Sequence, residues 1–137
     1  LSGSSRIERK LNLCKCSLAC AIRERNMARF DLIVLSRCTP GEEEAFEDWY
    51  ANQHLPDVCA IDGVVSARFT KVRYQKDYDL NPPPYGYLAI YEMEGEDPKA
   101  IMESILAVSG SDVMPLSPAL VRDKMIQAIG ETIATYP

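Results

Sequence analysis

The sequence contains no run of apolar residues that approaches the ~20 needed to span a bilayer as a helix, so it predicts no membrane-spanning segment. It is also poor in positive charge, with 15 basic against 20 acidic residues and a formal net charge of −5. Because nucleic-acid binding depends on a basic surface, this balance argues against nucleic acid as the main partner. We therefore expect neither a membrane nor a nucleic acid among the partners.

Motifs that hold metals or nucleotides are missing as well. The chain has one histidine, no glycine-rich phosphate loop, no HExxH sequence and no paired-carboxylate motif. Three cysteines, Cys14, Cys16 and Cys20, lie close together, but their spacing lacks the second half of a closed zinc site. We expect no metal site and no cofactor. Because the cysteines require no oxidising compartment, we also expect a cytoplasmic location.

Charge is distributed unevenly along the 137 residues. Residues 1–26 carry six basic and two acidic side chains, whereas residues 27–137 carry nine basic and eighteen acidic ones. A methionine, Met27, stands at the boundary. We interpret residues 1–26 as an N-terminal extension that is disordered or not native to the folded unit (an upstream or vector-derived segment, or a leader). Residues 27–137 are then expected to form one domain.

Four stretches rich in β-branched, apolar and aromatic residues are typical of strands. They are residues 30–38, 64–73, 85–93 and 125–134. The first is followed by the signals of a helix start: Thr39 fits the N-cap, Pro40 the first helical position and Glu42 the third, which makes a capping box. We expect this helix to reach about Leu55 and to end at Pro56.

A second helix is predicted between the third and fourth strands. Asp97 and Pro98 repeat the signature of a helix start, and Gly110 is typical of a helix end. The order β-α-β-β-α-β predicts an α+β, ferredoxin-like fold, a four-stranded antiparallel sheet with two helices on one face. Since the other face would be left apolar and uncovered, we expect a homodimer with a symmetric interface.

One stretch of the chain, residues 41–69, carries a set of residues that belong together: Phe46, Trp49, Tyr50, His54, Leu55, Pro56, Gly63, Val65, Ala67 and Arg68. With these residues the stretch resembles the dimeric α+β-barrel superfamily, and more specifically its EthD-like branch. Residues 87–94 (YLAIYEME) and 114–120 (MPLSPAL) also fit such chains. The resemblance implies a cofactor-free, dimeric, ferredoxin-like domain over residues 27–137, with a pocket between each sheet and its own helices. Chains of this fold include monooxygenases, cyclases, dehydratases, decarboxylases and isomerases, and fold alone does not choose among them.

The only histidine is the natural candidate for proton transfer, because the ordinary pKa of imidazole lies near neutrality. Tyr50 precedes His54 by four residues, so the two share a helix face. A position at the helix C-terminus would favour the charged imidazole. Asp57 could fix its tautomer or stabilise its cation. Arg68 lies in an apolar strand, where it could bind an anionic group or pair with an acidic residue.

Four aromatic residues complete the candidate site. Phe46 and Trp49 lie at helical spacing and can be core residues or stack on a substrate. Tyr87 and Tyr91 share one sheet face, which is either the pocket or the dimer interface.

Two classes of function fit these residues. The first is a small cofactor-independent enzyme that acts on a hydrophobic or aromatic carbonyl compound by elimination, isomerisation, cyclisation or decarboxylation. His54 would be its general acid or base, Tyr50 would donate to an oxyanion and Arg68 would orient the substrate. The alternative is a non-catalytic dimeric ligand-binding module. A cofactor-free monooxygenase acting on a phenol is a third possibility.

Overall fold

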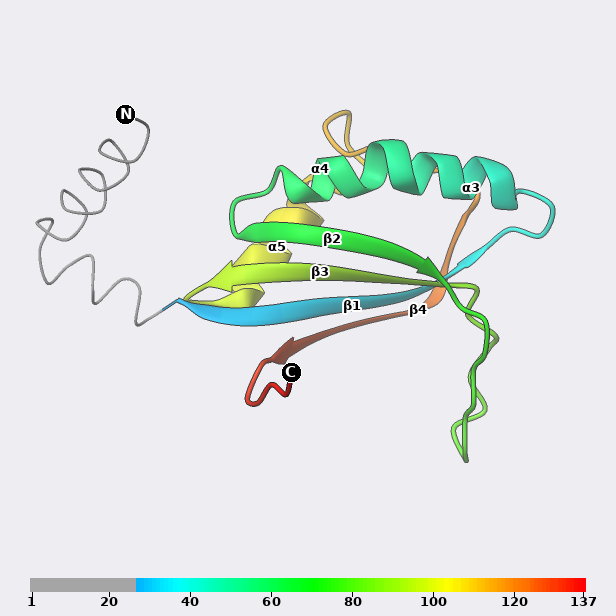
Figure 1. Cartoon of the computed structure of the whole chain (residues 1–137). Helices are drawn as coiled ribbons and strands as arrows, with labels where there is room; N and C mark the ends of the chain where they lie inside the picture. The colour runs from blue at the N-terminus through cyan, green and yellow to red at the C-terminus, as the bar shows by residue number, and fades with distance from the viewer. Residues whose placement is uncertain (1–26) are drawn as a thin grey trace, which may run out of the picture.

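The computed structural model of the chain describes residues 27–137, which form one twisted sheet with helices on one side (Figure 1). The interpretation of residues 1–26, with their three cysteines, lies outside the described residues. Neighbouring strands are antiparallel and follow the order β2-β3-β1-β4. The predicted ferredoxin-like α+β fold is therefore confirmed. The strands are β1 (Ala28–Cys38), β2 (Val64–Lys71), β3 (Tyr87–Gly95) and β4 (Leu120–Glu131).

The core lies between the sheet and the helices. In β1 and β3 every second side chain is buried, which is the pattern of strands covered on one face. The helices that cover this face are α3 (Glu43–Trp49), the π-helical turn η1 (Tyr50–His54), α4 (Leu55–Cys59) and α5 (Pro98–Val108). Phe46 is fully buried at the centre and contacts the rings of Tyr50, Phe69 and Tyr87. Tyr87 and Tyr91 both lie on this helix-covered face, not on the other one.

The start of the first helix differs from the prediction. Thr39 to Glu42 form a tight turn, in which the Glu42 N–H donates to the Thr39 carbonyl and Gly41 has a φ of 88°. The N-cap of α3 is Glu42, and its side chain makes no capping hydrogen bond. The capping box was therefore a wrong prediction, because Pro and Gly side by side favour a β-turn with the glycine in the left-handed region.

The end of this helix also differs. Pro56 does not stop it, and the helical chain continues to Cys59. The N–H of Leu55 donates to the carbonyl of Tyr50, five residues back, so the backbone widens into a π-turn just before the proline. Pro56 falls in the first turn of α4, where a missing N–H is tolerated.

The second helix behaves as predicted. The Asp97 side chain accepts a hydrogen bond from the N–H of Lys99 at 3.0 Å, and Pro98 is the first residue of α5. The helix ends at Val108, two residues before Gly110, whose φ is 82°. The last strand, in contrast, begins at Leu120, five residues earlier than predicted, because it follows β1 through an irregular register.

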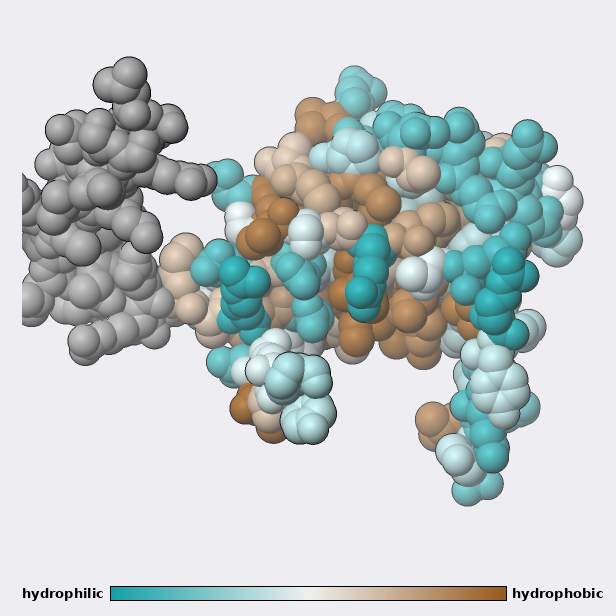
Figure 2. Space-filling view, viewed as in Figure 1, coloured by the Kyte–Doolittle hydropathy of each residue, from teal (hydrophilic) through white to brown (hydrophobic). Residues whose placement is uncertain are grey.

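The sheet face that carries no helix is mixed in character. Figure 2, in the view of Figure 1, shows hydrophilic residues along α3 and a mixture of hydrophobic and hydrophilic residues over the strands below it. Ile33 and Ile126 on this side are 38% and 42% exposed. Beside them, Asp31, Arg68 and Glu92 line a hollow of about 310 Å³. Within residues 27–137, no helix has both the length and the apolar composition to cross a membrane.

Candidate functional site

His54 closes the π-turn and is held between two aromatic rings. Its imidazole stacks on the indole of Trp49, with centroids 4.6 Å apart and planes at 26°. The edge of the Tyr50 ring meets it at 4.9 Å and 79°. Trp49 and His54 are five residues apart, the spacing that a π-turn brings together, whereas a regular α-helix would point them about 140° apart. The irregular turn therefore creates the stack.

A pair of tyrosines faces His54 from the helix and the sheet. The Tyr91 hydroxyl donates to the Tyr50 hydroxyl oxygen, with an O···O distance of 3.2 Å. The two residues are 1% and 2% exposed, and burial raises the pKa of both hydroxyls. Because the Tyr50 oxygen accepts this bond, its own proton is left to donate to a third oxygen atom.

These residues line a small cavity between the sheet and the helices. Its volume is about 40 Å³, which is room for a water molecule or a single carbonyl group. It is lined by Trp49, Tyr50 and His54 from the helical segment, by Tyr91 from β3, and by Met102, Met125 and Gln127. Methionine is unbranched and adaptable, so the two methionine side chains are the least rigid part of the lining.

The imidazole is neutral at physiological pH. Burial disfavours its charged form and lowers the pKa of His54 from 6.5 to about 4. The expectation that a helix C-terminus favours the cation was wrong, since the helix continues past His54 and its last carbonyls lie elsewhere. Nδ1 of His54 is buried and has no hydrogen-bond partner. Oδ2 of Asp57 is likewise buried without a partner, so no hydrogen bond joins these two atoms.

The other predicted site residues lie elsewhere. Arg68 is paired with Ile90 on the sheet, and this register places it on the face without helices, where it is exposed. It therefore does not reach the cavity of its own chain, as alternation along β2 requires. Phe46 belongs to the core and does not line the cavity. Tyr87 lines a second and larger pocket, at the end of the sheet.

The sequence did not predict the cavity-lining residues that come from distant segments, such as Met102 on α5 and Met125 on β4. The methionines on α5 and β4 carry no local signal, because only the tertiary fold brings them to His54. The larger pocket was missed as well, although Arg37 and Cys38 place a charged and a thiol side chain at the end of β1. Among residues 27–137, no group of three or more His, Cys, Asp or Glu side chains could hold a metal ion.

Two solved structures to which this chain is similar are described as an EthD family protein and an EthD-like protein. An ethyl tert-butyl ether D (EthD) family protein from Bacillus halodurans is 22% identical over 77% of this chain and 99% of its own, with a TM-score of 0.50. An EthD-like protein from Ralstonia eutropha is 11% identical over 80% of this chain and 96% of its own, with a TM-score of 0.53. No protein-family model and no curated protein matches the chain. At these identities the likeness concerns the fold, and it agrees with the predicted ferredoxin-like α+β fold.

Proposed function

We propose that the chain is a small cofactor-independent enzyme that removes a proton next to the carbonyl of a hydrophobic or aromatic compound. The observation that carries this proposal is the imidazole of His54, which lines a mostly apolar cavity beside the Tyr50–Tyr91 hydroxyl pair with its Nδ1 unpartnered. Buried polar groups without a partner cost stability and are often kept for ligand binding.

The geometry supports one sequence of steps. A substrate carbonyl enters the cavity, and the Tyr50 hydroxyl donates to its oxygen. His54 takes a proton from the adjacent carbon, and the electron pair of the broken C–H bond forms an enolate. The negative oxygen that results is stabilised by the tyrosine hydroxyl in a nearly water-free site. Return of the proton to another carbon completes an isomerisation, and loss of a leaving group completes an elimination.

The low pKa of His54 favours the base role over the acid role that the sequence left open. At pH 7 a neutral imidazole can accept a proton, whereas the imidazolium cation that would act as an acid is scarcely populated. The same low pKa makes it a weak base when no substrate is bound. This supports the second candidate, a ligand-binding module in which His54 only hydrogen-bonds its ligand.

Hydrogen exchange on carbon separates the two candidates. A panel of aromatic and β-keto compounds is incubated in D₂O with the protein, and loss of the α-proton signal is followed by NMR. We expect enzyme-dependent exchange that disappears in His54→Ala and persists in Gln53→Ala, which changes an exposed neighbour on the same turn. Binding that shifts protein resonances without any exchange, equal in both variants, favours the binding module.

The active unit of this proposal is a homodimer formed through the uncovered sheet face. Two features support it: the exposed isoleucines Ile33 and Ile126, and the neighbouring charges of opposite sign on Asp31, Arg68 and Glu92. In a symmetric dimer the same sheet face of both protomers forms the interface. Acidic side chains of one protomer can then pair with Arg68 of the other. Sedimentation should give twice the chain mass at micromolar concentration, and Ile33→Asp should give a folded monomer. A wild-type monomer at that concentration contradicts the dimer.

A further inference from the structure

The cavity beside His54 meets solvent at β4, which is an edge strand of the sheet. Within residues 27–137, Gln127 on β4 is the one exposed residue that lines this cavity, and the other lining residues are buried or half-buried. Gln127 pairs with Val34 in the register of β1 and β4, and Val34 is buried beneath the helices. Since directly opposed residues share a sheet face, Gln127 lies on the helix-covered side, at the mouth of the cavity.

The enclosed part of the cavity cannot hold a whole substrate. Its volume of about 40 Å³ is room for one carbonyl group, whereas small-molecule sites measure roughly 300–1,000 Å³. The body of a larger compound whose carbonyl reaches Tyr50 must therefore lie toward the mouth. There the half-buried side chains of Met102, Leu120 and Met125 provide apolar surface.

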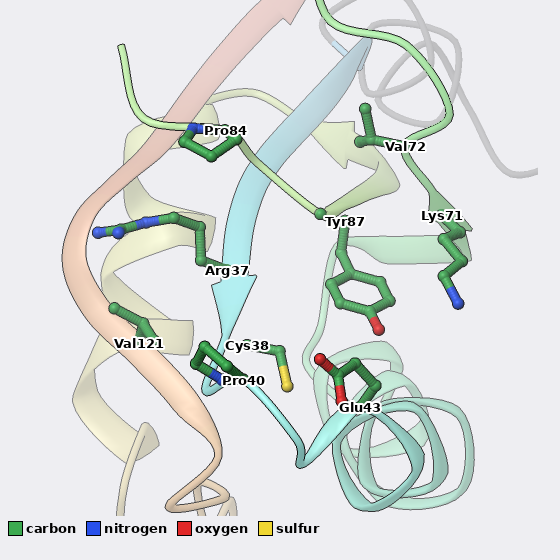
Figure 3. A pocket seen from close by; sticks show the side chains of 10 residues that line it. Arg37, Cys38, Pro40, Glu43, Lys71, Val72, Pro84, Tyr87 and Val121 are labelled. Atoms are coloured by element: carbon green, nitrogen blue, oxygen red, sulfur yellow. The ribbon is translucent and has the colours of Figure 1, made fainter.

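The larger cavity, of about 400 Å³ at the end of the sheet, does not extend this site (Figure 3). Within residues 27–137, no residue lines both it and the cavity beside His54. Phe69 stacks on the rings of Tyr50 and Tyr87, which belong to the one cavity and the other. Figure 3 shows Arg37 and Tyr87 on different sides of β1, so the polar groups there do not converge on one ligand.

Most hydrogen-bonding groups around the smaller cavity already have a task. The indole N–H of Trp49 donates to the Pro115 carbonyl at 3.2 Å, and the Tyr91 hydroxyl donates to Tyr50. In the proposed reaction the Tyr50 proton and the imidazole act on the substrate carbonyl and on the carbon beside it. The side-chain amide of Gln127 is left for a second polar group of the substrate, and it offers both a donor and an acceptor.

The lining also defines the charge of that substrate. Within residues 27–137, no Asp, Glu, Lys or Arg lines the cavity, and the imidazole of His54 is neutral at physiological pH. An ionised carboxylate or phosphate would lose its water there without gaining an opposite charge. The cavity therefore fits an uncharged compound.

We propose that Gln127 is the specificity-determining residue of this site and selects an uncharged aromatic ketone whose ring carries a hydroxyl group. The ring lies at the mouth beside Met102 and Met125, and its hydroxyl exchanges hydrogen bonds with the amide of Gln127. The position of the carbonyl at Tyr50 rests on the proposed function. The new element is the polar group that the substrate carries at its other end.

The test compares para- and meta-hydroxyacetophenone with para-methylacetophenone, in which a methyl group replaces the hydroxyl. Dissociation constants for the full chain are measured by calorimetry. Wild type should bind at least one hydroxy compound about three- to tenfold more tightly than the methyl compound, as one uncharged hydrogen bond provides. Gln127→Leu, which keeps the size of the side chain, should abolish this preference. Gln127→Glu, which keeps an acceptor for the hydroxyl proton, should retain it.

A matched control makes the same chemical change away from the cavity. Gln53→Leu replaces an exposed glutamine that does not line the cavity, and it should keep the preference of wild type. Because Gln127 is exposed, Gln127→Leu should stay folded, and its melting temperature checks this.

The outcomes separate the role of Gln127 from the role of His54, because the same compounds are also followed by NMR for exchange of the protons next to the carbonyl. If Gln127→Leu loses the preference but no compound exchanges protons, Gln127 selects the ligand and His54 is not a base. If protons exchange while wild type and Gln127→Leu show the same preference, the base role stands and Gln127 does not determine specificity. The role of Gln127 is also overturned if none of the three compounds binds to wild type at millimolar concentration.

Discussion

The two helical segments of the domain follow local rules to very different degrees. In α5 the aspartate cap, the proline in the first turn and the glycine beyond the end all act as their types predict. The segment α3–η1–α4 has no side-chain cap, widens into a π-turn and carries a proline inside it. Trp49, Tyr50 and His54 all lie on the segment α3–η1–α4. Sequence and structure disagree locally where the chemistry is proposed, as is common at functional sites.

The largest expected effect is the loss of carbon-proton exchange activity when His54, on the irregular segment, is replaced. His54→Ala should lower the rate of carbon-proton exchange by ~10²–10⁴, the usual contribution of a positioned base, while costing only ~1 kcal/mol of unfolding free energy. Rates come from the NMR exchange assay and stability from urea titration. A parallel fall in both quantities, or an unchanged rate, means that the residue is structural.

The next effect concerns pH and stability. His54 has a pKa of about 4 when folded and about 6.5 when unfolded, so below pH 6.5 the unfolded chain binds a proton that the folded chain does not. Above pH 6.5 the imidazole is neutral in both states, and His54 adds no pH dependence to stability. As pH falls to 4, proton binding by the unfolded chain should lower the unfolding free energy by about 3 kcal/mol. The fall is measured as the difference between wild type and His54→Gln.

Since the chain has one histidine, NMR titration of its imidazole reads the same pKa directly. Trp49→Ala removes the stacked indole and should move the pKa upward toward 6.5. A wild-type value near 6.5 contradicts the buried, neutral imidazole on which the base role rests.

A smaller effect is expected in the regular segment. Asp97→Ala removes the side chain that accepts from the Lys99 N–H and should cost ~1 kcal/mol of unfolding free energy. The pKa of His54 should not change, because α5 meets the cavity through its middle and not through its start. A shift of that pKa by the cap variant indicates that the two segments are coupled.

The same comparison explains what could be read from the sequence. Strand alternation and the α5 signals depend on neighbours in the chain, so the fold and the Asp97 cap were predictable. The sequence did not show which face of the sheet carries Tyr87 and Tyr91. Alternation along a strand places them on the same face but does not say which face the helices cover. Arg68 was a candidate for the pocket because of its charge, its apolar strand and the resemblance, with pairing to an acidic residue left open. Its register on β2 places it on the other sheet face. The π-turn has no sequence signature of its own, so the Trp49–His54 stack and the low pKa of His54 could not be foreseen.

The smallest effect should come from Pro56→Ala, and its size tests how the irregular segment accommodates the proline. In the interior of a regular helix, exchanging proline for alanine gains about 3 kcal/mol. Here the π-turn has already displaced the backbone hydrogen bonds before Pro56, so alanine gains at most one bond, worth ~0.5–1.5 kcal/mol. It also frees the unfolded chain, which costs ~0.4–1 kcal/mol. The two terms nearly cancel, and urea titration should show a change below ~1 kcal/mol. Stabilisation by ~3 kcal/mol means that Pro56 strains an ordinary helix, and the π-turn is then a response to that strain and not a feature kept for the site.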